Sequence, residues 1–172
     1  MRRHFILFVL LVVHWVFWSD LPARGEALAT NQAATQEPLV ILVNSANNID
    51  NLTIEELRKI FQGQRSHWPN GRKITLVVRE AGNPEHETAL RQIFRMSESE
   101  YERHFLHSTF TGEMAAPPKQ LATAAGVKKF IFHVPGAVGY VRASEVDNTV
   151  KVVPINGHNP KDRDYPLRLI PR

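Results

Sequence analysis

The stretch from Ile74 to Phe94, ITLVVREAGNPEHETALRQIF, constrains the fold more than any other part of this sequence. Ile74 to Val78 is a short apolar run rich in β-branched residues, which is typical of a buried strand. Asn83 suits a helix N-cap, and Pro84 suits the first helical position, where its missing N–H would have no partner. The pattern therefore predicts a strand, a tight turn at Gly82 and a helix, in that order.

Arg79 comes directly after this predicted strand. Backbone N–H groups at the start of the helix, the positive end of its dipole and the Arg79 guanidinium would all face the same loop. This combination can bind an anion, with Arg79 as its charged group. The alternative is an ordinary connection in which Arg79 is only solvated.

A second strand is predicted from Leu39 to Val43, whose sequence LVILV is apolar throughout. Such a run fits a strand buried on both faces of a parallel sheet. The polar loop 44–48 follows, and ligands of open α/β sheets bind at the carboxyl ends of the strands. We therefore expect Ser45 to join the anion site.

Helix signals alternate with these strands. Thr53 with Glu56, and Ser97 with Glu100, have the spacing of capping boxes. They predict helices from residue 54 to Phe61, with Gly63 just beyond the end, and from residue 98 to about His107. The remaining elements are a helix over 121–134 and strands over 137–141 and 150–155. Strands that alternate with helices indicate the α/β class, with a mixed, mostly parallel sheet flanked by helices.

The first 29 residues have the form of a secretory signal peptide. Arg2 and Arg3 precede an apolar run from Phe5 to Trp18, and Ala27-Leu28-Ala29 matches an A-x-A cleavage site. The run is shorter than the roughly 20 residues that span a bilayer, although an uncleaved anchor is the alternative. We expect cleavage after Ala29 and a flexible leader over 30–38; the general and twin-arginine export routes stay open.

Composition excludes several classes of protein. Without the three arginines and two acidic residues of 1–29, the totals of 21 basic and 17 acidic residues leave a net charge of +3. This is too mild for a nucleic-acid-binding protein, which needs a concentrated basic face. There is no cysteine, so disulfides and thiolate metal sites are absent. About 140 residues after the cleavage site indicate one domain.

Three segments stand out in a fixed order and spacing: LTIEELRKIFQGQRSHWPNGRKI (52–74), Phe110-Thr111-Gly112 and PGAVGYV (135–141). In sequence, order and spacing they resemble the periplasmic phosphate-binding proteins of ABC transporters. The resemblance implies one lobe of the type II periplasmic binding-protein fold over 39–155, followed by a proline-containing tail, 156–172. Family members that capture phosphate are about twice as long and close two lobes around it. A second lobe would then come from a homodimer mate or from another periplasmic or membrane protein.

The resemblance also assigns residues. The phosphate-binding arginine of the family matches Arg79, Gly82 keeps the turn, and Asn83 offers an amide in place of a serine hydroxyl. Glu85 replaces a threonine, and a carboxylate beside phosphate costs about 1 to 4 kcal/mol at surface-like dielectric constants. Thr88, one turn further, offers a partial replacement. The resemblance thus implies weak or partner-dependent binding of phosphate or a similar oxyanion.

Other chemistry has less support. Glu100, His104 and His107 lie on one predicted helix and could hold a metal ion, although His104 also fits a packing position. No arrangement of a nucleophile with a base, and no acid–base pair, is present, so we expect neither an enzyme nor a cofactor. The alternative to oxyanion binding is a periplasmic adaptor that keeps the fold and binds a protein.

Overall fold

The protein is described by a computed structural model that covers residues 36–170. Its sheet has five strands in the order β3-β2-β4-β1-β5. The strands are β1 (Leu39–Val43), β2 (Thr75–Arg79), β3 (Lys119–Leu121), β4 (Ala137–Arg142) and β5 (Lys151–Val152). The helices are α1 (Ile54–Phe61), α2 (Pro84–Ala89), α3 (Glu98–Phe110) and α4 (Ala124–His133), with a π-helical turn, η1 (Leu90–Phe94), and a 3-10 turn, η2 (Ala143–Glu145). The α/β class and the mixed sheet flanked by helices are confirmed.

Strand directions differ from the expectation at one place. β2 pairs in parallel with β3 and β4, but β1 is antiparallel to both β4 and β5. The prediction of β1 as a parallel strand is therefore wrong. All five residues of β1 are buried because the strand is covered on both faces. A central strand has this pattern in either a parallel or an antiparallel orientation, so the pattern does not give its direction.

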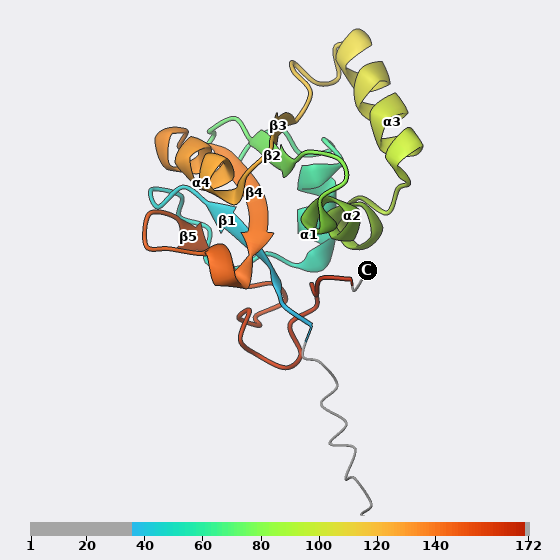
Figure 1. Cartoon of the computed structure of the whole chain (residues 1–172). Helices are drawn as coiled ribbons and strands as arrows, with labels where there is room; N and C mark the ends of the chain where they lie inside the picture. The colour runs from blue at the N-terminus through green and yellow to red at the C-terminus, as the bar shows by residue number, and fades with distance from the viewer. Residues whose placement is uncertain (1–35, 171–172) are drawn as a thin grey trace, which may run out of the picture. The chain divides into compact units, whose positions relative to one another are not determined.

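Two helical layers cover the sheet, and Figure 1 shows α4 on one side of it and α1 with α2 on the other. Successive residues of β1 point to opposite faces. Leu39 and Ile41 belong to the core with α1, α2, η1 and α3, whereas Val40 and Leu42 belong to the core with α4. The sheet is thus buried on both faces, so a ligand site is expected at the carboxyl ends of its strands.

The predicted helix starts are confirmed. Thr53 and Ser97 are N-caps whose hydroxyls accept from the N–H of Glu56 and Glu100, and both capping boxes are complete. α4 forms where a helix was predicted, and α3 extends three residues beyond His107 to Phe110. These signals are contained in a few neighbouring residues, so local sequence suffices to predict them.

Other boundaries are corrected. β3 has only three residues, two of them polar, and its sequence carried no strand signal. β5 is confined to Lys151–Val152 instead of 150–155. After Ala89 the helix widens into η1, and it ends at Arg95, which has a left-handed φ of 59°.

The segment 156–170 is part of the core, which corrects the prediction of a tail outside the domain. Tyr165, Leu167 and Leu169 are buried, and the Tyr165 hydroxyl donates to the Leu39 carbonyl at 3.0 Å. The end of the expected leader is also engaged, since the Leu169 N–H donates to the Glu37 carbonyl at 2.8 Å. Prolines exclude regular strands and helices from this segment, but they do not prevent burial.

The predicted signal peptide, 1–29, and most of the leader lie outside the described residues. Within 36–170, no helix combines the length and apolar character that a membrane span requires.

Candidate functional site

Arg79 is the last residue of β2 and lies at the carboxyl edge of the sheet. It is 7% exposed, and its Nη2 donates to Oδ1 of Asn83 at 3.1 Å. Its Nε and Nη1 are buried and have no hydrogen-bond partner within 36–170. Arg79 therefore carries a buried charge with two uncommitted donor groups.

The turn after Arg79 forms as predicted, but its asparagine acts differently. Gly82 has a φ of +80°, a left-handed conformation that suits glycine. Asn83 occupies the N-cap position of α2 without a side-chain cap bond. Its Oδ1 accepts from Arg79 instead, and its Nδ2 donates to the Glu80 carbonyl at 2.8 Å. The structure thus brings Arg79, Gly82 and Asn83 together, with Asn83 as an orienting residue for the guanidinium.

Glu85 is paired with a residue that sequence reasoning missed. It is 1% exposed, and its Oε1 accepts from Nε of Arg142, at the end of β4. Burial opposes its ionisation, but the Arg142 hydrogen bond, a bond from its own N–H, and the Arg142 and Arg79 charges outweigh this and lower its pKa below the usual 4.5. Glu85 therefore stays ionised, and its Oε2 lacks a hydrogen-bond partner within 36–170.

Arg142 could have been found from the resemblance segment. It directly follows PGAVGYV, which forms most of β4. β4 is the parallel neighbour of β2 in the sheet, so both strands end at one edge. The missing information was the strand order, because the two strands are separated by more than fifty residues.

Thr88 lies in α2, and its hydroxyl bonds to the C-terminal segment. It is fully buried, and its Oγ1 accepts from the Ile170 N–H at 3.1 Å. The hydroxyl thus holds the C-terminal segment against α2. This role could not be predicted without knowing how residues 156–170 fold.

Ser45 is not brought to this edge. Because β1 is antiparallel to β4, Val43 lies opposite Val138 and Leu39 lies opposite Arg142. The loop after Val43 is consequently at the other edge of the sheet from Arg142, and Ser45 is exposed there. The neighbouring Asn44 closes α4, since its Nδ2 donates to the carbonyls of Ile131 and Phe132 at 2.8 and 2.7 Å.

A polar cluster centred on the buried His86 connects α2 to its neighbours. His86 is fully buried, with Nε2 2.9 Å from Glu98 and Nδ1 3.3 Å from the Tyr140 hydroxyl. Burial raises the pKa of Tyr140 well above 10, so its hydroxyl stays protonated. The cluster joins α2, α3 and β4, and it fixes the helix that carries Glu85.

The alternative metal residues are used for packing. Glu100 caps α3, and Nε2 of His104 lies 2.9 Å from the Gln62 carbonyl. In the part of the chain that the structure describes, no three histidine, aspartate or glutamate residues form a group that could hold a metal ion.

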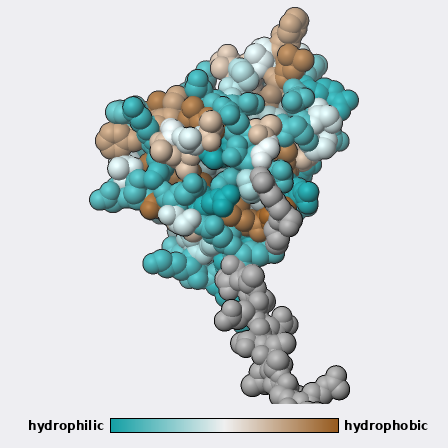
Figure 2. Space-filling view, viewed as in Figure 1, coloured by the Kyte–Doolittle hydropathy of each residue, from teal (hydrophilic) through white to brown (hydrophobic). Residues whose placement is uncertain are grey.

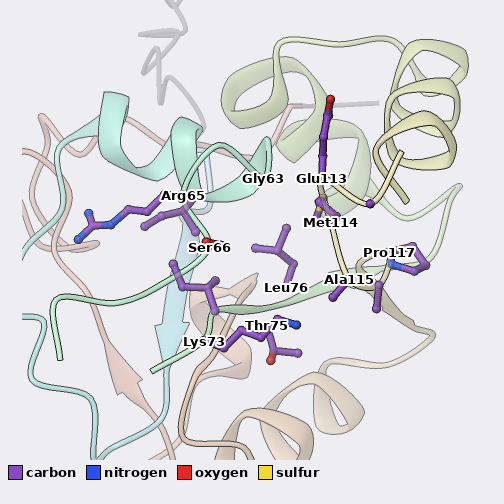
Figure 3. Close-up of a pocket in the computed structure, with 14 residues that line it drawn as sticks. Gly63, Arg65, Ser66, Lys73, Thr75, Leu76, Glu113, Met114, Ala115 and Pro117 are labelled. Carbon is purple, nitrogen blue, oxygen red and sulfur yellow. The ribbon is translucent and has the colours of Figure 1, made fainter. Parts of the chain in front are cut away.

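A cavity of about 350 Å³ lies beside the start of β2, away from Arg79. In Figure 3, Leu76 and Met114 face its interior, whereas the guanidinium of Arg65 points away from them. Its lining comes from the end of α1, the start of β2 and the loop 112–117, and it includes Gly63, Ser66, Lys73, Thr75 and Pro117. This cavity does not contain any of the predicted anion-binding residues.

Comparisons with known proteins agree with this fold. The profile of a family described as "PBP superfamily domain" matches residues 23–167. An ABC-type phosphate transport receptor from Vibrio cholerae has a similar structure, with a TM-score of 0.57 and 23% identity over 74% of this chain and 50% of the receptor. For a phosphate ABC transporter substrate-binding protein from Clostridium perfringens, with bound phosphate, the TM-score is 0.60 and the identity is 17%. The match covers 73% of this chain and 48% of that protein. For PstS from Borrelia burgdorferi, the TM-score is 0.61 and the identity is 16%, and the match covers 77% of this chain and 55% of PstS.

The chain thus spans about half the length of these solved structures. At identities of 16 to 23%, the likeness shows a shared fold.

Proposed function

This chain belongs to the family described as PBP superfamily domain, and on that premise we propose that it is an exported protein that binds phosphate or a similar oxyanion weakly or with a partner. It acts as a binding protein and not as an enzyme. Two similar structures are named as phosphate transport proteins, and one of them holds phosphate. These names support the ligand class, and the predicted signal peptide, 1–29, supports a periplasmic location.

The observation that carries the proposal is the state of Arg79. A buried charge is costly unless hydrogen bonds and an opposite charge compensate it. Arg79 makes one side-chain hydrogen bond, to Asn83, while Nε and Nη1 lack hydrogen-bond partners within 36–170. Two guanidinium nitrogens can hold two oxygens of one oxyanion, which gives both energy and orientation.

Weak or assisted binding follows from two features. Glu85 places a negative charge in the same region, and it opposes a second anion. The match also covers only about half of the phosphate proteins that the chain resembles. A second lobe from a homodimer mate or another periplasmic protein would supply the missing contacts.

Isothermal titration of residues 30–172 with phosphate at neutral pH and low salt tests this proposal, with sulfate as a comparison. We expect saturable heat for the wild type and none for Arg79→Ala. Arg72→Ala is the matched control, because Arg72 is an exposed arginine outside the site. Circular dichroism checks that each variant is folded. Absence of heat at millimolar phosphate in the wild type would contradict the proposal.

A second candidate, a protein-binding adaptor, is favoured by an exposed apolar surface on α3. Leu106 and Phe110 are 70% and 90% exposed, and Figure 2 shows hydrophobic side chains gathered at the tip of α3. Next to them lies a groove of about 400 Å³, lined by Tyr101, Phe105 and Leu106 of α3 and by Pro117 and Pro118. An exposed apolar ridge beside a groove can pair with the same surface of another copy about a two-fold axis, and a second copy of the chain is the partner that we propose for this surface.

Sedimentation velocity tests this second candidate. Phe110→Ser should shift a concentration-dependent dimer toward monomer, whereas Phe132→Ser, on α4, should not. Phe132 is the matched control because it is also an exposed phenylalanine, with 50% of its surface accessible. A wild-type chain that stays monomeric at high concentration would exclude this self-association.

A further inference from the structure

We infer that Arg142 is a second cationic residue of the anion site, and that Glu85 occupies this residue as an internal counterion. The inference rests on the proposed function, and it concerns what controls access to the same site. Phosphate and related oxyanions are the ligands concerned, and the negative charge of Glu85 sets how strongly they bind.

The strand order brings the two arginines to one edge. β2 and β4 are adjacent and parallel, with Thr75 opposite Ala137 and Leu76 opposite Val138. β2 ends at Arg79 and β4 ends at Arg142, so both side chains start from the carboxyl edge of the sheet. Glu85 is the second residue of α2, which begins at this edge after the Gly82 turn.

The two arginines at this edge are paired differently. Glu85 forms an ion pair with Arg142 through Oε1, and its Oε2 has no hydrogen-bond partner within 36–170. Arg79 is near enough for its charge to lower the pKa of Glu85, yet within 36–170 it forms no ion pair. Arg142 is therefore paired with the buried Glu85, and the Glu37 and Glu145 carboxylates also act on its charge, whereas Arg79 has no carboxylate partner within 36–170.

Exposure gives the three side chains different roles. The Arg142 side chain is 35% exposed, whereas the Glu85 side chain is 2% exposed and Arg79 is 7% exposed. Arg142 is consequently the member that meets an anion arriving from solvent. Its Nε is already held by a carboxylate oxygen, which is the contact that an external oxyanion would make. An external anion must compete with this contact and with the charge of Glu85.

Titration of Glu85→Gln with inorganic phosphate tests the inference. Glutamine keeps the size of the side chain and an oxygen that can accept from Arg142, but it removes the charge. Removal of one negative charge a few ångströms from a dianion should lower the phosphate Kd about tenfold or more. Arg142→Gln added to Glu85→Gln should reverse this gain. Glu55→Gln is the matched control, because it removes a carboxylate from an exposed ion pair on α1 and should leave the Kd unchanged.

The outcomes separate this inference from the proposed function. If Arg79→Ala abolishes binding and Glu85→Gln binds no tighter than the wild type, the inference is overturned and the proposed function stands. If only Glu85→Gln binds, and Arg142→Gln removes that binding, the inference holds and the wild type is not an anion binder. If no variant binds, both are overturned.

A second variant protects the test against misfolding. Should Glu85→Gln lose a cooperative urea transition, Glu85→Ser replaces it, with the same expected gain. A phosphate-dependent rise in the thermal midpoint then measures binding, because a ligand that binds only the folded state raises its stability. No larger rise in Glu85→Ser than in the wild type would overturn the inference.

Discussion

Substitution of Leu167 by alanine should show that the C-terminal segment is part of the folded core. Leu167 is 1% exposed and belongs to the core that contains β1 and α1. Full burial of a leucine side chain contributes about 1.5 to 3 kcal/mol, and the cavity left by alanine adds to this loss. We expect Leu167→Ala to lower the free energy of unfolding by about 2 to 4 kcal/mol. That is a large part of the roughly 5 to 15 kcal/mol that stabilise an ordinary domain.

Urea denaturation at pH 7 measures this change, with an unchanged m-value as the check that both variants unfold to the same extent. Leu106→Ala is the matched control, because it makes the same chemical change at a side chain that is 70% exposed. It should cost less than about 0.5 kcal/mol. Equal losses in the two variants would refute the conclusion that 156–170 packs into the core.

Three further results are expected. Asn44→Ala removes two hydrogen bonds to the end of α4 and should cost about 1 to 3 kcal/mol in urea denaturation, whereas Asn48→Ala, at an exposed position of the same loop, should cost almost nothing. Gly136→Ala would place a Cβ 2.1 Å from the Lys73 carbonyl oxygen, so its thermal midpoint should fall by several degrees; an unchanged midpoint would contradict this contact. The folded-state pKa of Glu85 lies below 4.5, so its contribution to stability is present above that pH and is lost as pH falls through the folded pKa. The urea midpoint of the wild type should therefore fall more steeply from pH 5 to pH 3 than that of Glu85→Gln, and parallel curves would contradict the ionised buried pair.

Sequence predicted well those features that a few neighbouring residues determine. The capping boxes at Thr53 and Ser97 formed because each N-cap and its glutamate are three residues apart, within one helical turn. Arg79, Gly82 and Asn83 are close for the same reason, since a strand end and a tight turn keep five consecutive residues together. The apolar run of β1 predicted burial on both faces, which its composition alone requires.

Strand direction and long-range pairing were not available from sequence. The run LVILV reads equally well in either direction, so it could not show that β1 is antiparallel or that Ser45 lies at the other edge. The proline-containing segment after Ile155 gave no periodic pattern, although its buried residues complete the core.

The α/β class, the helix starts and the local turn that holds Arg79 could all be predicted from the sequence. The pairing of Glu85 with Arg142, a residue 57 positions away, and the bond from Thr88 to the C-terminal segment became visible only in the folded chain. The difference lies in the range of the interactions. Capping and turn geometry act within one turn of the chain, whereas the charge balance at the site depends on which strands the sheet brings side by side.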